Sequence, residues 1–213
     1  MNEKVLIIGA GHGLSASIAR LFAAEGMKVG LAARNVDKLT PLAGEIGAST
    51  FACDATDADA VAALFKAFEA EIGCPDILVY NPSGRVRGPI TEVDAAATKE
   101  AILVTAYGAF LAAKQAAIRM LKAGAGTMLF TGASAGVKGY PRSAPFAMGK
   151  FALRGLCQSL ARELSPQNIH IAHFVIDGRI HNNARDEPHG PCLGPRFHGF
   201  TKFINQALHG NRQ

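Results

Sequence analysis

The chain has 213 residues, of which 49% are hydrophobic and 18% are charged. This length suits one ordinary α/β domain with its own buried core, and the composition excludes a disordered or collagen-like protein. The formal net charge of +5 favours an anionic partner. Because the Lys and Arg residues form no basic run and Trp is absent, we expect no nucleic-acid binding. A phosphate-bearing small molecule also fits the charge.

The cysteines and the apolar runs indicate a cytoplasmic protein. No two of the four cysteines have the spacing of a metal-ligand motif, so we interpret them as reduced thiols. The first apolar run begins at Val5 and is short, and no charged region followed by a long apolar stretch opens the chain, so we expect no signal peptide. No apolar run approaches the roughly 20 residues that span a bilayer, and we therefore expect no membrane association.

Strand-like and helix-like segments alternate along the chain. A short apolar run predicts a strand at 4–8, and helical spacing predicts a helix from Leu14 that Gly26 ends. Strands are predicted at 28–33, 49–53 and 76–80, with a helical face over 61–72 before the third of these. A helix at 95–122, a strand at 127–131, a helix at 144–164 and a strand at 169–176 follow.

This alternation predicts the fold class. Strands separated by helices pair in parallel through right-handed crossovers. We therefore expect a single-domain Rossmann-type doubly wound parallel sheet with helices on both faces, over residues 1–178. Residues 179–213 are expected to form a loop-rich C-terminal tail. The spacings of its four histidines match no compact ligand motif, and we expect no metal site.

A glycine-rich turn follows the first predicted strand and opens the first helix. Its sequence is Gly9-Ala10-Gly11-His12-Gly13-Leu14-Ser15. Glycines permit a tight turn and let the backbone approach a pyrophosphate, and a helix N-terminus supplies N–H groups and partial positive charge. The strand–turn–helix context therefore predicts a dinucleotide-binding turn, although a βα turn without a ligand has the same pattern.

The end of the second strand indicates which dinucleotide binds. An NAD-binding protein usually has an acidic residue here, which binds the ribose hydroxyls. This chain has Arg34 instead, a residue whose guanidinium suits a 2′-phosphate, and His12 offers a second contact. We therefore expect NADP (NADPH) rather than NAD, the alternative being that Arg34 is a solvated charge at the strand end.

Several motifs from Val5 to about Gly178 resemble the short-chain dehydrogenase/reductase family. Gly9 and Gly13 have the family's glycine spacing, with Ser15 in place of the last Gly. Asp54 and Ala55 lie in a segment, 53–56, that resembles the motif whose Asp binds the adenine ring, and Asn81 retains the Asn of the segment that closes the fourth strand. By this resemblance the cofactor-binding residues are Gly9, Gly11, His12, Gly13, Leu14, Arg34, Asp54, Ala55, Asn81, Lys150, Gly178 and Ile180.

The catalytic motif of the family is only partly retained. Lys150 matches the Lys of Tyr-x-x-x-Lys, which lowers the pKa of the Tyr and binds the nicotinamide ribose. Phe146 stands in the place of the Tyr, whose hydroxyl exchanges the substrate proton. By the family spacing the Ser falls on Ala133, next to Ser134, and the Asn falls on Thr105. The resemblance therefore implies an atypical active site.

Three hydroxyls are candidates to replace the missing acid. Ser134 follows the fifth strand, Tyr140 lies on the loop expected to border the nicotinamide, and Ser143 precedes Phe146 by one helical turn. The alternatives are that Tyr140 is a loop aromatic and that Ser143 caps the following helix, and we expect the cap as the main role of Ser143.

The residues leave two functions open. The first is an NADP(H)-dependent oxidoreductase acting on a small carbonyl or alcohol. The second is a catalytically impaired NADP(H)-binding protein, such as a sensor or a regulatory subunit. Reduction of an activated C=C or C=N bond is a weaker third possibility. The resemblance also implies a homodimer or homotetramer paired through the helices at 95–122 and 144–164, and a shortened substrate region after Gly178.

Overall fold

The computed structural model describes residues 3–177. The elements in chain order are β1 (Lys4–Ile8), α1 (Leu14–Ala24), β2 (Lys28–Ala33), η1 (Asp37–Leu39), α2 (Thr40–Ile46), β3 (Ser49–Ala52), α3 (Ala58–Glu71), β4 (Ile77–Tyr80), α4 (Ala95–Ile102), η2 (Leu103–Tyr107), α5 (Gly108–Ala123), β5 (Gly126–Thr131), η3 (Ser134–Gly136), α6 (Ala144–Leu164), η4 (Ser165–Gln167) and β6 (Ile169–Phe174). Strands and helices alternate as the hydrophobic pattern predicts.

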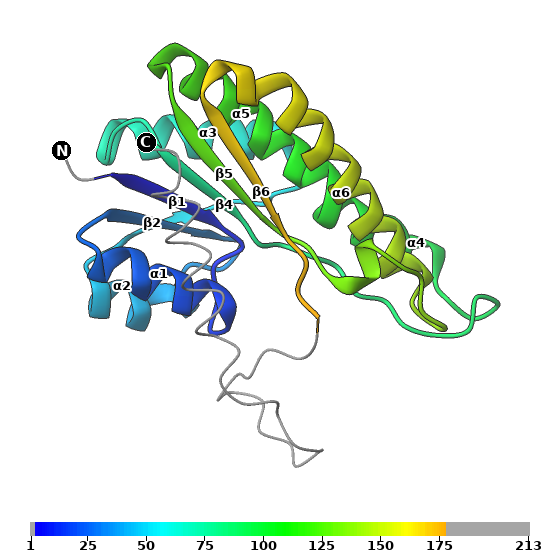
Figure 1. Cartoon of the computed structure of the whole chain (residues 1–213). Helices are drawn as coiled ribbons and strands as arrows, with labels where there is room; N and C mark the ends of the chain where they lie inside the picture. Colours follow the sequence, from blue (N-terminus) through cyan, green and yellow to red (C-terminus); the bar gives the residue numbers. More distant parts are fainter. Residues whose placement is uncertain (1–2, 178–213) are drawn as a thin grey trace.

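The six strands form one sheet in the order β3-β2-β1-β4-β5-β6. Every neighbouring pair is parallel. Figure 1 shows α1 and α2 on one face of the sheet and α3, α5 and α6 on the other. The predicted Rossmann-type doubly wound fold is therefore confirmed. The strand order reverses between β1 and β4, and ligands of such sheets bind at the carboxyl ends of the strands beside this reversal.

Two apolar layers hold the helices on the sheet. One joins α3, α5 and α6 to it through residues such as Phe65, Phe68 and Phe130, which are fully buried. The other joins α1 and α2 to the opposite face through residues such as Phe22 and Leu31. Because both faces are covered, β1 and β4 carry nearly continuous apolar runs instead of alternating ones.

The long predicted helix at 95–122 is interrupted by a π-helical turn, η2. The N–H of Gly108 bonds the carbonyl of Leu103, five residues back, which leaves the Val104 carbonyl free to accept the Tyr80 hydroxyl. A Cβ atom at position 108 would lie 2.3 Å from that hydroxyl, so glycine permits the close approach. The interruption therefore results from the buried tyrosine of β4 inserting its hydroxyl against the helix.

Other boundaries also differ from the prediction. The 169–176 strand ends at Phe174, opposite Thr131, the last residue of β5. The N–H groups of Gly132 and Ser134 still donate to the carbonyls of Phe174 and Ile176, so the two segments stay side by side beyond the regular strands. Helix α2 was not predicted, because its seven residues are too few to show a periodic pattern. It has Pro41 in its first turn, and Gly47, with φ +66°, follows its last residue. The 49–53 strand ends one residue earlier, at Ala52.

The span Ala95–Ala123 is long and apolar enough to cross a membrane by length and composition, contrary to our expectation that no such run exists. It is the only such helix in residues 3–177. Its α5 part buries the alanines Ala109, Ala112, Ala113 and Ala116 in the core layer beside α3 and the sheet. The buried alanines account for part of the apolar composition of α5, whereas Phe110, Ile118 and Leu121 are exposed.

Candidate functional site

The glycine turn after β1 is closed tightly against β2 and the loop after β4. The N–H groups of Gly9 and Ala10 both donate to the Ala32 carbonyl, at 2.9 and 3.0 Å. Gly9 has φ +80°, and a Cβ atom there would lie 2.7 Å from the Pro82 ring. Only glycine fits this position without strain. The turn therefore holds the backbone at the carboxyl end of β1 in one conformation.

Ser15 and Gly13 shape the start of α1. Ser15 is buried, and its hydroxyl accepts the Gly11 N–H at 2.9 Å, so this serine closes the turn from inside. Gly13 occupies the N-cap position of α1 and provides no side-chain cap for the helix, whose first residue is Leu14. A helix start without a side-chain cap can present its N–H groups and its partial positive charge to a bound phosphate.

Arg34 and Asp54 lie just past the ends of the neighbouring strands β2 and β3. Arg34 is exposed and has no ion pair within residues 3–177. Hydrogen bonds from the Thr56 N–H and hydroxyl, together with the charge of Arg34, lower the pKa of Asp54. Ala55 is buried beside Gly108. A cation and an anion thus lie together at the edge where the resemblance places the adenosine.

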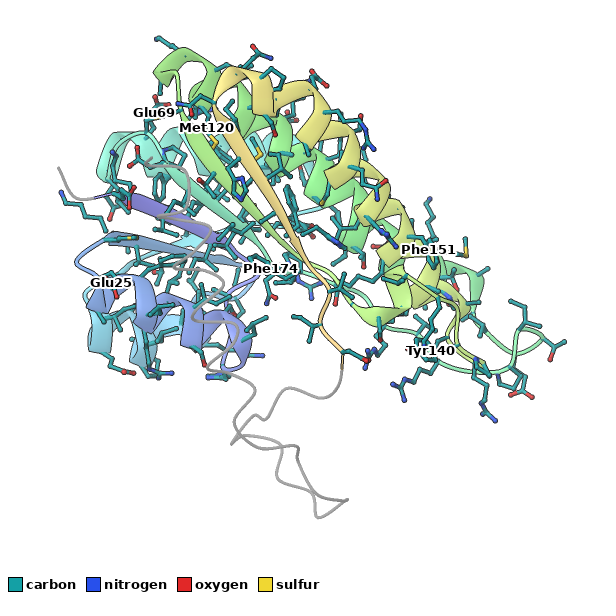
Figure 2. The ribbon with its side chains drawn as sticks, in the orientation of Figure 1. Glu25, Glu69, Met120, Tyr140, Phe151 and Phe174 are labelled. Carbon is teal, nitrogen blue, oxygen red and sulfur yellow. The ribbon has the colours of Figure 1, made fainter. Side chains whose placement is uncertain are left out.

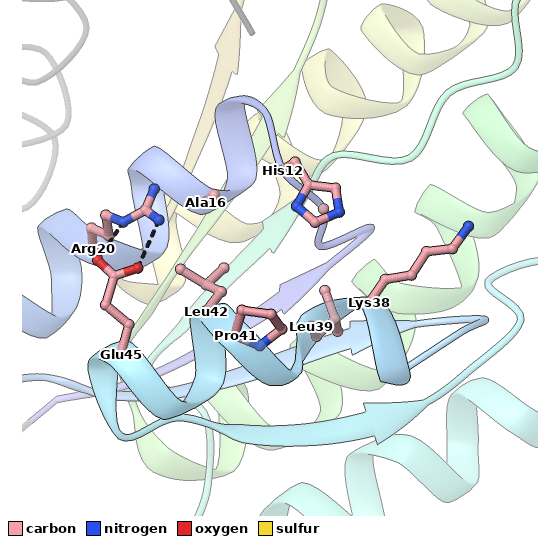
Figure 3. A pocket seen from close by; sticks show the side chains of 9 residues that line it. His12, Ala16, Arg20, Lys38, Leu39, Pro41, Leu42 and Glu45 are labelled. Carbon is pink, nitrogen blue, oxygen red and sulfur yellow. Dashed lines mark hydrogen bonds and ion pairs between the residues drawn. The ribbon is translucent and has the colours of Figure 1, made fainter. Parts of the chain in front are cut away.

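A hollow beside the glycine turn contains a further cation that sequence reasoning did not identify. Gly11 and His12 line it from the glycine turn and Ala16 from α1, and η1 and α2 contribute Lys38, Leu39, Pro41, Leu42 and Glu45 (Figure 3). Arg20 is neutralised there by two bonds of 2.7 Å to Glu45. His12 and Lys38 have no ion pair in the described part of the chain. Lys38 follows Arg34 by four residues in the loop after β2, which is the signal that could have identified it.

A chain of hydrogen bonds connects the glycine turn with Lys150. The Asn81 side-chain amide donates to the Gly9 carbonyl at 3.3 Å, and its oxygen accepts the Thr131 hydroxyl at 3.0 Å. The Lys150 ammonium donates to the Thr131 carbonyl at 2.7 Å. The ends of β1, β4 and β5 and the first turns of α6 are thereby fixed relative to one another. Thr131 was not predicted as a site residue.

Lys150 is an unusually buried cation. Its side chain is 3% exposed, and no carboxylate pairs with it in residues 3–177. Burial, followed by the charge of Arg85, lowers the pKa of Lys150 to about 8. A structural role would favour an apolar residue at this depth, since burying an unpaired charge is costly. A buried lysine with a pKa near neutrality is typical of a functional site.

Phe146 lies one turn before Lys150 on α6 and is buried. Two cations approach its ring: the Arg85 guanidinium carbon lies 4.2 Å from the ring centroid and the Lys150 ammonium lies 5.9 Å from it. Arg85 comes from the loop between β4 and α4. The ring therefore lies close both to the buried lysine and to the exposed Arg85.

The three candidate hydroxyls lie on the loop between β5 and α6 and have no hydrogen bond to Lys150 in the described structure. Ser134 begins η3, and Tyr140 is 38% exposed with the Lys138 ammonium 5.2 Å from its ring centroid (Figure 2). Ser143 occupies the predicted N-cap position of α6, but its side chain makes no capping hydrogen bond. Its φ of −134° and ψ of 22° lie outside the extended region in which N-cap side chains reach the helix.

Thr105 is buried in η2, and its hydroxyl accepts the Gly84 N–H at 3.0 Å. It thus holds the loop after β4 against the helix. Gly178 and Ile180, predicted to contact the cofactor, lie outside the described residues, as does the predicted tail at 179–213. No cluster of metal-ligating side chains occurs within residues 3–177.

Comparison with known proteins identifies relatives of the whole fold. The chain is 31% identical over 180 residues to the 3-oxoacyl-(acyl-carrier-protein) reductase MabA of Mycobacterium tuberculosis, covering 84% of this chain and 70% of that protein. It is 29% identical over 200 residues to the D-threitol dehydrogenase of Mycolicibacterium smegmatis, covering 90% and 76%.

Solved structures share the architecture. A short-chain dehydrogenase from Rhodopseudomonas palustris has a TM-score of 0.78 at 36% identity and covers 88% of this chain and 86% of its own. NAD+-bound xylitol dehydrogenase has a TM-score of 0.79 at 25% identity, covering 82% and 70%. A gluconate 5-dehydrogenase from Burkholderia cenocepacia in complex with NADP and tartrate has a TM-score of 0.78 at 25% identity, covering 83% and 72%. The short chain dehydrogenase family model matches residues 3–180, and the chain belongs to this family.

Proposed function

We propose that the protein is an NADP(H)-dependent oxidoreductase that acts on a small carbonyl or alcohol. The observation that carries the proposal is the hydrogen-bonded chain from the glycine turn through Asn81 and Thr131 to the buried Lys150. It couples a phosphate-binding turn to a cation at the depth where a nicotinamide ring would lie. The relatives named above, a reductase and several dehydrogenases, support this class of reaction.

The residues present fit a nicotinamide dinucleotide. At Gly11 a Cβ atom would meet nothing within 4 Å, so the turn has an open side toward a ligand. The diphosphate would be held by Gly9, Gly11, His12, Gly13 and Leu14. The adenosine would be held by Arg34, Asp54 and Ala55, and the nicotinamide ribose by Asn81 and Lys150. Two further proposed cofactor contacts, Gly178 and Ile180, lie outside the described residues. When bound, the cofactor supplies or accepts a hydride.

The preference for NADP rests on uncompensated positive charge. His12 and Lys38 line the hollow beside the glycine turn, and the two cations Arg34 and Lys38 have no ion pair within residues 3–177. A 2′-phosphate would neutralise them, whereas NAD would leave them unmatched. The double variant Arg34→Ala with Lys38→Ala should weaken NADPH binding about tenfold or more and leave NADH binding nearly unchanged. Calorimetry measures both, with Arg162→Ala at the far end of α6 as the control; equal losses for both coenzymes would refute the preference.

The proton in carbonyl reduction must come from a group other than residue 146. Phe146 stands where the family pattern has tyrosine and has no exchangeable proton. A serine hydroxyl alone is a weak acid, but Lys150, with a pKa of about 8, is suited to act as a general acid near neutral pH. Two of its three N–H groups remain after the bond to Thr131. We propose that Lys150 supplies the proton and that Ser134, Tyr140 or Ser143 passes it to the substrate oxygen once the substrate is bound, since none of the three bonds Lys150 in the described structure.

The relay is tested one hydroxyl at a time. The variants Ser134→Ala, Tyr140→Phe and Ser143→Ala are assayed for NADPH oxidation with a panel of aldehydes and ketones. The variant that lacks the relay hydroxyl should have a kcat about 10²–10⁴-fold lower than the native protein and an unchanged affinity for NADPH. If all three variants keep full activity, no hydroxyl relays the proton.

The buried, covered Phe146 favours one alternative, an NADP(H)-binding sensor or regulatory subunit that does not turn over. The Arg85 guanidinium also covers part of the ring, 4.2 Å from its centroid. Under this alternative the native protein binds NADPH and reduces no carbonyl, and Phe146→Tyr confers activity. Native turnover would exclude it.

The protein is further proposed to form a homodimer or homotetramer through α5 and α6. Large apolar side chains on these helices are exposed, including Phe110 at 45%, Ile118 at 55% and Met148 at 55%. Phe151 on α6 is 45% exposed (Figure 2). Exposed apolar side chains that cluster on neighbouring helices are typical of an interface between subunits.

A further inference from the structure

The backbone that precedes Arg85 is held in place, whereas the Arg85 side chain itself is exposed. The preceding Gly84 packs so closely on α4 that a Cβ atom there would lie 2.3 Å from the Ala101 Cα. Its N–H donates to the buried Thr105 hydroxyl at 3.0 Å. The loop therefore cannot shift without losing both contacts. Its next residue, Arg85, lies with its guanidinium 4.2 Å from the centroid of the Phe146 ring.

The charge of Arg85 is not neutralised within residues 3–177. The ion pairs found there join Lys4 with Asp76, Arg20 with Glu45 and Arg119 with Glu69, all outside this region. The neighbouring charges that act on Arg85 are those of Arg87 and Lys150, and both are positive. Burial and Arg87 lower the pKa of Arg85, which is the direction expected of a cation that lacks a partner.

A second loop adds further positive charge on this side. The Gly88 N–H donates to the Arg142 carbonyl at 3.2 Å, which joins the loop of Arg85 to the loop that precedes α6. That second loop carries Lys138 and Arg142. Cations gathered on one side of a protein raise the local concentration of anions there.

Packing of the guanidinium on the Phe146 ring does not account for Arg85 by itself. The ring face attracts the cation but provides no oxygen acceptor for its N–H groups. A guanidinium has five N–H donors arranged in a rigid fork, and that fork matches the two oxygens of a carboxylate. No hydrogen bond from Arg85 to another residue is present in the described structure. Its donors are therefore available to a ligand beside Phe146 and Lys150.

We propose that Arg85 binds a carboxylate of the substrate, so that the protein acts on an oxo acid or a hydroxy acid rather than on a neutral carbonyl or alcohol. This inference rests on the oxidoreductase proposed above and names its substrate class. Arg85 positions the carboxylate at the mouth of the site, and the carbonyl or hydroxyl carbon reaches inward toward Lys150. Arg87 contributes through its charge.

Matched pairs of probes that differ only in the negative charge test the proposal. NADPH oxidation is measured with pyruvate against methyl pyruvate, levulinate against methyl levulinate, and 4-carboxybenzaldehyde against methyl 4-formylbenzoate. For at least one pair, kcat/KM should be about tenfold or more higher for the acid than for the ester. Arg85→Gln should abolish this preference, Arg85→Lys should retain part of it, and Arg162→Gln should leave it unchanged.

A binding measurement gives a readout that does not depend on turnover. Malonate and glutarate are titrated calorimetrically into the full chain saturated with NADPH, for the native protein and for Arg85→Gln. The native protein should bind at least one of them, and the variant should bind it about tenfold or more weakly with unchanged NADPH affinity. Absence of dicarboxylate binding by the native protein, or equal binding by the variant, overturns the role of Arg85. Failure to bind NADPH at all instead overturns the proposed function.

Discussion

Replacing Lys150 by methionine removes a buried charge and retains much of the side-chain volume. Burial lowers the pKa of Lys150 from 10.5 to about 8. Each unit of this shift corresponds to about 1.4 kcal/mol, so the charged lysine costs the folded state about 3 kcal/mol at pH 7. The lost bond to the Thr131 carbonyl offsets about 1–3 kcal/mol of that gain in the variant. The variant should therefore be as stable as the native protein at pH 7, or more stable.

The difference in unfolding free energy between the native protein and Lys150→Met should depend on pH, and this dependence is the sharper test. Between pH 8 and pH 10.5 the unfolded chain keeps a proton on Lys150 that the folded chain has lost. The free energy of unfolding of the native protein therefore rises with pH through this window, whereas the methionine variant has no such contribution. From pH 7 to about pH 9.5 the native protein should gain about 2 kcal/mol relative to the variant.

Urea denaturation followed by circular dichroism at both pH values measures this difference. Lys114→Met, which removes an exposed lysine from α5, is the matched control, and its effect on stability should stay within about 0.5 kcal/mol. If the difference between native protein and Lys150→Met does not change with pH, or changes in the opposite direction, the ammonium of Lys150 is not destabilised by burial and the reasoning fails.

Three further substitutions test other parts of the structure. Gly9→Ala forces a Cβ atom to 2.7 Å from Pro82 at φ +80°, and it should cost about 2 kcal/mol or more in urea denaturation and abolish NADPH binding in calorimetry; a variant with native affinity would contradict the packing. Thr105→Val removes the acceptor of the Gly84 N–H and should lower the unfolding free energy by about 1–3 kcal/mol, whereas an unchanged value would show that the bond is dispensable. Phe110→Glu places a charge on the exposed face of α5 and should yield monomers in light scattering if this face joins subunits.

The hydrophobic pattern predicts most of the fold because each strand of a doubly wound sheet is a short, nearly continuous apolar run between longer helical faces. The runs at β1 and β4 and the helix α6 are of this kind. The interruption at η2 was not predictable in this way, because it depends on the Tyr80 hydroxyl reaching the Val104 carbonyl across the core. Likewise α2 is too short to show a period.

The candidate site also contains residues that the sequence predicts and residues that it does not. The glycine turn and Lys150 belong to local motifs, so their positions follow from the sequence neighbourhood. Arg85 lies in a loop and Lys38 in the short η1. The spacing of Lys38 from Arg34 is a local signal, but the sequence around either residue does not show what its side chain approaches. Arg85 reaches Phe146 because Gly84 packs on α4, and Lys38 borders the hollow because α2 folds back beside α1. Such contacts between distant segments become visible only in the folded chain.

Calorimetric titration of the full chain with NADPH and with NADH tests the central claim most directly, since every step of the proposed chemistry requires a coenzyme on the glycine turn. We predict saturable binding of NADPH that is at least about tenfold tighter than that of NADH. Tighter binding of NADH would contradict the role of Arg34 and Lys38. Binding of neither coenzyme would contradict the account as a whole.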